Sequence, residues 1–161
     1  MARLPRKLLA AGDAAPDFAL DDLAGGKHTL SGVLERGAAL VAIYKIGCPT
    51  CQLTLPFLDR VHRSGGLQVI GVSQDNASGT ERFQGRLRIA LPSLLDREED
   101  GYRLSNAFGV SYVPSLFLIE PDGRISLALE GFVKSELEAI GKRAGIEVFG
   151  AGDHVPEWKA G

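Results

Sequence analysis

The feature that most constrains this chain is an apolar run that leads directly into two cysteines separated by two residues. Residues 38–44 are continuously apolar, within a predicted strand at 38–46, as expected for a strand covered on both faces. Cys48 and Cys51 follow, and residues 52–63 then have helical spacing. These are the only cysteines in the sequence. A strand that runs into Cys-x-x-Cys at the start of a helix is typical of thiol–disulfide chemistry.

The position of the two cysteines predicts unequal roles for them. The thiolate is the reactive form, and an unperturbed cysteine with a pKa of about 8.5 provides little of it at neutral pH. If the helix begins near Pro49, Cys48 occupies its N-cap region, where unpaired amides and the helix dipole favour an anion. Cys51 lies one turn further in, where we expect it to be more buried and protonated. We therefore predict that Cys48 attacks and Cys51 resolves.

Composition and charge indicate one ordinary domain, spanning residues 1–161 with a core at about 12–144, an N-terminal arm and a C-terminal tail. The sequence has 161 residues, is 45% hydrophobic and carries a net charge of −2, which argues against nucleic acid or an anionic membrane as the main partner. No apolar run approaches the roughly 18–20 residues of a membrane span. Residues 1–11 lack the apolar stretch of about 7–15 residues that a secretory signal needs, so we expect a cytoplasmic protein. A leader already removed would leave the same pattern.

The hydrophobic pattern predicts alternating strands and helices after an extended arm at residues 1–12. We expect extended segments at 12–20, 27–30, 38–46, 67–73, 91–95, 115–119 and 124–130. We expect helices at 31–36, with Ser31 as the cap, and at 49–63, 78–89, 98–108 and 133–144. This order describes an α/β fold with a central mixed sheet flanked by helices. Residues 145–161 show no clear pattern.

The helix predicted at 49–63 has one apolar face. Leu55, Leu58 and Val61 fall on that face, whereas Asp59 and its basic neighbours point to solvent. Pro56 lies inside the helix and removes one of its backbone hydrogen bonds, so we expect a kink there.

Four motifs together give the chain a family resemblance. They are Ala15-Pro16-Asp17-Phe18-Ala19-Leu20 after Gly12, Cys48-Pro49-Thr50-Cys51 with Pro56 five residues later, the segment Phe108-Gly109-Val110-Ser111-Tyr112-Val113-Pro114-Ser115, and Pro121-Asp122-Gly123-Arg124-Ile125. Over residues 12–144 the chain resembles the thioredoxin superfamily, in its redoxin branch of TlpA/ResA-like thiol–disulfide oxidoreductases and AhpC/TSA-type proteins.

The resemblance implies a thioredoxin fold with an N-terminal β-hairpin and an extra βα insertion. It also implies that Pro114 is cis and packs against the cysteines, and that the backbone of Val113 pairs with an incoming peptide. Cis peptide bonds occur mainly before proline, because there the cis form is only about 0.5–1 kcal/mol less stable than the trans form. The long separation of Cys51 from Pro114 fits the extra βα element.

The chain departs from the family pattern at the positions that usually supply a proton acceptor. Thioredoxins carry a tryptophan where this chain has Gly47, and a buried acid where it has Ala42. The acid that some TlpA-like proteins place after the second cysteine is Thr54. By proximity, Lys45 and Asp75 are the substitutes. We treat Lys45, Pro49 and Thr50 as supporting residues of the Cys48–Cys51 site.

Three functions are compatible with these residues. The first is exchange with protein disulfides through Cys48 and Cys51, with protein disulfide or dithiol substrates and a recycling reductant as partners. The second is an antioxidant AhpC/TSA-type peroxidase in which Cys48 forms a sulfenic acid and Cys51 resolves it. Peroxiredoxins place a threonine and a proline where this chain has Lys45 and Val41, which favours exchange. The third is a redox-sensing binding module.

We predict neither a metal nor a cofactor beyond the redox-active Cys48–Cys51 disulfide. A zinc site would need two more ligands, and His28, His62 and His154 are scattered along the sequence. We assign these histidines no role.

Overall fold

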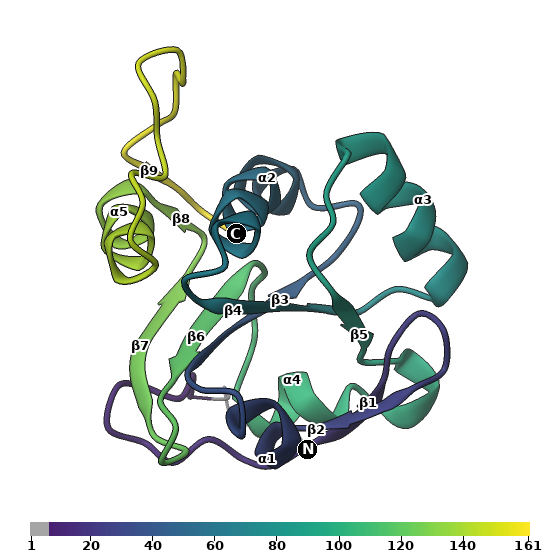
Figure 1. Cartoon of the computed structure of the whole chain (residues 1–161). Coiled ribbons are helices and arrows are strands. Elements are labelled where there is room, and N and C mark those ends of the chain that lie inside the picture. The colour runs from purple at the N-terminus through teal and green to yellow at the C-terminus, as the bar shows by residue number, and fades with distance from the viewer. Residues whose placement is uncertain (1–6) are drawn as a thin grey trace.

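The computed structural model describes residues 7–161 (Figure 1). The strands are β1 (Ala19–Asp21), β2 (Lys27–Thr29), β3 (Ala39–Tyr44), β4 (Gln68–Ser73), β5 (Ser93–Leu95), β6 (Ser115–Ile119), β7 (Ile125–Glu130), β8 (Phe132–Val133) and β9 (Trp158–Lys159). The helices are α1 (Leu30–Leu34), α2 (Pro49–Ser64), α3 (Ala77–Leu87), α4 (Arg103–Ala107) and α5 (Lys134–Arg143), with a 3₁₀ turn, η1, at Glu98–Asp100. The first half of the arm predicted at residues 1–12 lies outside the described residues.

A mixed sheet forms the centre of the fold, as predicted. Within the described part of the chain it has five strands in the order β5-β4-β3-β6-β7. Strands β3, β4 and β5 are parallel, whereas β6 runs antiparallel to both β3 and β7. The parallel strands are joined through helices and the antiparallel pair β6-β7 through a tight turn, as their connections require.

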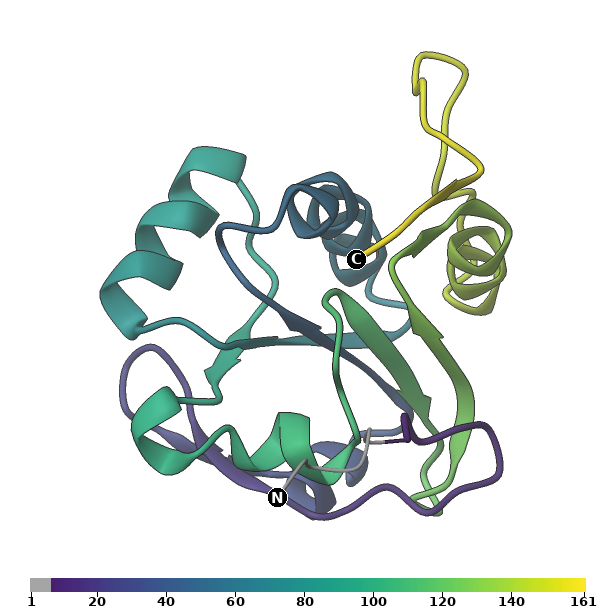
Figure 2. The same ribbon diagram turned by 180° about the vertical axis from the view of Figure 1, so that it is seen from behind.

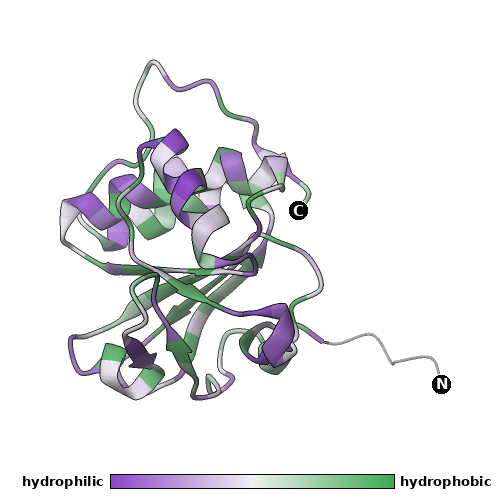
Figure 3. Cartoon of the chain, turned by 90° about the vertical axis from the view of Figure 1, so that its right-hand side faces the viewer, coloured by the Kyte–Doolittle hydropathy of each residue, from purple (hydrophilic) through white to green (hydrophobic). Residues whose placement is uncertain are grey.

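Strand β3 is buried on both faces, which explains its unbroken apolar sequence. Leu40, Ala42 and Tyr44 face one hydrophobic cluster, beneath α2, α3 and α5. Ala39, Val41 and Ile43 face a second cluster, beneath α1, α4 and the β1-β2 hairpin. Figures 1 and 2 show these two layers on opposite sides of the sheet, and Figure 3 shows the hydrophobic strands between more hydrophilic helices.

The N-terminal hairpin is present but shorter than predicted. Residues 12–18 approach the sheet through the single bridge Ala14–Arg124, and only β1 pairs with β2. The following helix begins one residue early because Thr29, not Ser31, is its N-cap. The Thr29 hydroxyl accepts the N–H of Gly32 at 3.1 Å.

The single helix predicted at 98–108 is wrong. The chain instead forms η1 and then α4, with Gly101 and Tyr102 between them in left-handed conformation, at φ 74° and 50°. A continuous helix needs right-handed backbone at every residue. These two left-handed residues therefore separate η1 from α4. The buried carboxylate of Asp96 accepts N–H groups in the first turn of α4 and replaces the missing cap.

Asp59 was expected at the surface of the helix and is instead buried, at 5% exposure. One carboxylate oxygen accepts the N–H groups of Ala90 and Leu91, at 2.8 and 2.9 Å. The other pairs with Arg63 at 2.6 Å, one turn further along α2. The helical pattern correctly predicted which face of α2 is apolar. It could not predict that the loop before β5 covers Asp59.

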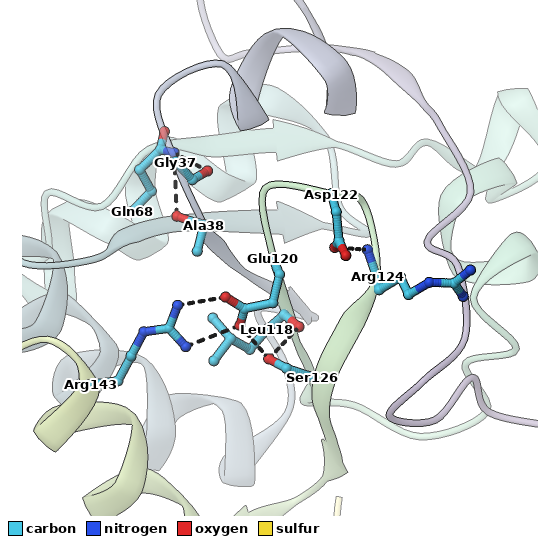
Figure 4. A network of polar contacts seen from close by, with 9 residues as sticks. All are labelled: Gly37, Ala38, Gln68, Leu118, Glu120, Asp122, Arg124, Ser126 and Arg143. Atoms are coloured by element: carbon cyan, nitrogen blue, oxygen red, sulfur yellow. Dashed lines mark hydrogen bonds and ion pairs between the residues drawn. The ribbon is translucent and has the colours of Figure 1, made fainter.

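Polar contacts attach α5 to the β6-β7 hairpin (Figure 4). The guanidinium of Arg143 donates to both oxygens of Glu120, at 2.6 and 3.0 Å, and the Ser126 hydroxyl lies 2.6 Å from the same carboxylate. Together these donors lower the pKa of Glu120. None of the helices in the described part of the chain combines the length and apolar composition that a membrane span requires.

Candidate active site

The register of the sheet places the two cysteines beside Pro114. Strands β3 and β6 are antiparallel, and Ile43 pairs with Ser115. The end of β3, which leads into α2, therefore lies next to the start of β6. The peptide bond between Val113 and Pro114 is cis, as predicted. Segments more than sixty residues apart in the sequence thus meet at one edge of the molecule.

Cys48 is the N-cap residue of α2, and Pro49 occupies the first turn, where its missing N–H costs no hydrogen bond. The Cys48 sulfur accepts the backbone N–H of Cys51 at 3.1 Å and lies 3.4 Å from the carbonyl oxygen of Val113. Its side chain is half-buried. An N-cap sulfur receives an amide that would otherwise be unpaired, and the same amide favours a negative charge on it.

Cys51 lies one turn inside α2 and is completely buried, at 0% exposure. Both cysteines are free thiols here. Burial raises the pKa of the Cys51 thiol, and the hydrogen bond with Cys48 raises it further. The helix therefore presents one accessible sulfur and one protected sulfur, so the prediction that Cys51 is the more buried of the two is confirmed.

The loop between β3 and α2 is fixed by two side chains. The carboxylate of Asp75 accepts the N–H of Ile46 at 2.8 Å, and the Gln52 amide donates to the Ile46 carbonyl at 3.0 Å. Lys45 takes part through its backbone, because its carbonyl accepts the N–H of Cys48 at 3.4 Å. Its ammonium group lies 6.0 Å from the ring centre of Tyr102. The hydrogen bond accepted by Asp75 thus holds the loop that precedes Cys48.

The hydroxyls of two threonines in the first turns of α2 donate hydrogen bonds to backbone carbonyl groups. Thr54 donates to the carbonyl of Thr50 at 2.7 Å, inside the helix. Thr50 donates to the carbonyl of Ala160 at 2.6 Å, more than one hundred residues away in the sequence. Sequence analysis did not anticipate Ala160 at the site, because residues 145–161 carry no periodic or motif signal.

A groove of about 370 Å³ opens beside the reactive sulfur. It is lined by Lys45, Cys48, Pro49, Gln74, residues 110–113 and Gly161. A larger cavity of about 610 Å³ lies along β4 and the residues before β5, and neither cysteine lines it. The chemistry of the cysteines therefore places the candidate site in the smaller groove.

No metal centre accompanies the cysteines in the described residues, where no group of three or more His, Cys, Asp or Glu side chains is placed to hold an ion. His28 instead pairs with Asp22 at 2.7 Å in the N-terminal hairpin. This contact lowers the pKa of Asp22.

Comparison with known families agrees with this geometry. Residues 11–128 match the model of the AhpC/TSA family. The chain belongs to the AhpC/TSA family. Among curated relatives, this AhpC/TSA protein is similar to the thiol-disulfide oxidoreductase ResA of Geobacillus thermodenitrificans. The two are 28% identical over 141 residues, which cover 82% of this chain and 79% of the relative.

Solved structures show the same thioredoxin fold. The thioredoxin domain of a thiol-disulfide oxidoreductase from Bacteroides vulgatus superimposes with a TM-score of 0.72 at 21% identity, covering 84% of this chain and 97% of that one. A thiol:disulfide interchange protein from Chlorobium tepidum gives a TM-score of 0.67 at 21% identity, covering 86% and 98%. The fold predicted from the four motifs is confirmed.

Proposed function

We propose that this AhpC/TSA protein is a thiol–disulfide oxidoreductase that exchanges electrons with disulfides of protein partners through Cys48 and Cys51. One observation carries the proposal: the half-buried Cys48 sulfur caps α2, and the fully buried Cys51 follows one turn later. Similarity to ResA, a thiol-disulfide oxidoreductase, supports it.

The exchange begins at the Cys48 thiolate. It attacks one sulfur of the partner's disulfide, that S–S bond breaks, and the departing sulfur leaves as a thiolate that takes up a proton. A mixed disulfide now joins Cys48 to the partner. Cys51 loses its proton and attacks the Cys48 sulfur, which releases the partner's second thiol. The chain ends with a Cys48–Cys51 disulfide, and two electrons have passed to the partner.

Three groups around the Cys48 sulfur have a place in these steps. The N–H of Cys51 stabilises negative charge on Cys48 before it attacks the partner's disulfide. The Val113 carbonyl borders the line along which a disulfide approaches Cys48. Cys51 stays protonated until the mixed disulfide has formed, because burial holds its pKa above the ordinary range. Repeated turnover requires a dithiol reductant that reduces the Cys48–Cys51 disulfide and is itself oxidised to a disulfide.

Peroxidase activity is the second candidate, because the AhpC/TSA family model covers the cysteine segment. In that reaction the Cys48 thiolate attacks one oxygen of hydrogen peroxide and becomes a sulfenic acid, with hydroxide leaving as water. Cys51 then attacks the sulfur, and a second water leaves. Both reactions end at the same disulfide, so only the oxidant distinguishes them.

The deciding experiment compares two rate constants for the reduced protein at one pH. We expect oxidation by hydrogen peroxide to be no faster than that of a free thiolate such as reduced glutathione, and reaction with a protein disulfide to be faster. A peroxide rate orders of magnitude above the free thiolate identifies a peroxidase instead. Slow reaction with both, combined with a partner affinity that depends on the redox state, identifies a redox-sensing module.

A further inference from the structure

The last five residues of the sequence lie over the candidate site. Residues 157–161, here called the covering segment, include β9, which pairs antiparallel with β8. In this pairing Phe132 faces Lys159 and Val133 faces Trp158, and the N–H of Lys134 donates to the carbonyl of Glu157 at 3.0 Å. Figures 1 and 2 show the chain then continuing from β9 to the start of α2.

The end of the covering segment touches the same groups that surround Cys48. The Thr50 hydroxyl, between the two cysteines, donates to the carbonyl of Ala160 at 2.6 Å. Gly161 packs so closely on the backbone of Val113 that a methyl group on its Cα would collide with the Val113 carbonyl oxygen. That oxygen is the one beside the Cys48 sulfur. The segment therefore borders the groove through which a disulfide must approach.

The covering segment is held mainly by its backbone. All five of its residues are exposed, and the Trp158 side chain is 62% exposed. Its contacts are a two-residue strand pair, hydrogen bonds to the carbonyls of Glu157 and Ala160, and an exposed ion pair between Glu157 and Lys134 at 3.5 Å. A segment with few buried apolar contacts opens at low free-energy cost. Backbone hydrogen bonds also make no demand on sequence, so another extended chain can replace it.

We propose that the strip formed by β8, the first turn of α2 and the Val113 backbone is a docking surface for an extended segment of a protein partner, and that the covering segment occupies this strip until the partner displaces it. The inference rests on the proposed function and specifies how its protein partner docks. The partner contributes an extended strand that pairs with β8 and has a small residue where Gly161 lies. A small aromatic disulfide reaches Cys48 through the groove without needing the strip.

The first test follows the covering segment in a trapped complex. The full-length Cys51→Ser variant is joined through Cys48 to a tryptophan-free peptide that carries one cysteine, and amide hydrogen exchange is compared with the unjoined variant. We expect exchange at residues 157–161 to become at least fivefold faster in the complex. The anisotropy of Trp158, the only tryptophan in the sequence, should fall in parallel. Unchanged exchange in a formed complex overturns the inference and leaves the proposed function intact, whereas the absence of any complex contradicts the proposed function.

The second test weakens the covering segment in the full chain. Proline cannot donate to a strand ladder, so Lys159→Pro loosens β9. We expect the ratio of the rate constant for a protein disulfide to that for 5,5′-dithiobis(2-nitrobenzoate) to rise several-fold. Ala151→Pro, which changes an exposed turn outside the strip, is the matched control and should leave the ratio unchanged. An equal change for both disulfides, or no change, contradicts displacement by protein partners.

Discussion

The sulfur of Cys48 lies 3.4 Å from the carbonyl oxygen of Val113, the residue joined to Pro114 by a cis peptide bond. This contact exists because β3 and β6 are antiparallel neighbours, so the residue before β6 meets the helix that follows β3. It brings together the attacking sulfur and a backbone group that an extended substrate must pass. The two predictions about these cysteines start from this arrangement.

The first prediction concerns the division of labour between the cysteines. Cys51→Ser should accumulate a mixed disulfide with a protein substrate, because serine cannot displace the partner from Cys48. Cys48→Ser is the matched control and should form almost no adduct, because the remaining Cys51 is fully buried. Mass spectrometry under non-reducing conditions measures both. Adducts formed mainly through Cys51 would reverse the assigned roles.

The second prediction concerns the pH dependence of stability in the reduced protein. Burial raises the pKa of Cys51 in the folded state, whereas in the unfolded chain a cysteine has a pKa of about 8.5. Above that pH the unfolded state loses this proton and the folded state keeps it, so the free energy of unfolding falls as pH rises. One such proton contributes at most about 1.4 kcal/mol per pH unit.

Urea unfolding between pH 7 and 10 in the presence of a reductant measures this slope. Cys51→Ala lacks the titrating group, so its stability should fall less steeply over the same range. The comparison of slopes is insensitive to the constant cost of the smaller side chain. Equal slopes for the two proteins would contradict the assignment to Cys51.

Most of the sheet and the chemical site could be predicted from the sequence because local signals coincide there. Each of these signals is contained in a few consecutive residues: the apolar run at β3, the cysteines at the start of a helix, and the Val113-Pro114 motif. The break between η1 and α4 was only partly visible in the sequence. Gly101 is a residue type that commonly ends helices, but nothing in the sequence indicates that Tyr102 also adopts the left-handed conformation. Burial of Asp59 depends in the same way on a loop that returns thirty residues later.

The covering segment shows the same limit at the site itself. Ala160 and Gly161 have no motif or periodicity, and they reach Thr50 and Val113 only because β9 pairs with the two residues of β8. Contacts made by backbone groups leave almost no trace in residue type. The one signal is glycine at Gly131 and Gly161, where backbones approach too closely for a side chain.

The third prediction tests the buried carboxylate of Asp59. Asp59→Ala removes the acceptor for the N–H groups of Ala90 and Leu91 and leaves Arg63 without its partner. Most of the cost comes from the two backbone donors, because Arg63 is itself largely exposed. We expect a loss of about 2–4 kcal/mol in the free energy of unfolding.

The denaturation midpoint in urea measures the Asp59 effect. Glu81→Ala is the matched control, since Glu81 is an exposed helical acid, and it should change stability by no more than about 0.5 kcal/mol. A loss for Asp59→Ala as small as that of the control would show that the loop before β5 is held by other contacts.

The fourth prediction separates two roles for Asp75. Its carboxylate accepts the N–H of Ile46 at 2.8 Å and so positions the loop that precedes Cys48. Asp75→Asn keeps an oxygen that can accept this hydrogen bond, whereas Asp75→Ala does not. If positioning is the role, the rate of disulfide exchange should fall about tenfold in the alanine variant and remain near wild type in the asparagine variant, since small misplacements of reacting groups are costly.

A proton-acceptor role for Asp75 gives a different pattern. Removal of the negative charge would then slow the step in which Cys51 loses its proton, and both variants would lose about 10²–10⁴ in rate. The loss would shrink as pH rises, because hydroxide and buffer bases take over the proton. Single-turnover rates of the second step at pH 6 and pH 9 therefore distinguish the roles: an alanine defect that is independent of pH and absent in asparagine supports positioning, whereas equal, pH-dependent defects make the Asp75 carboxylate the base for Cys51.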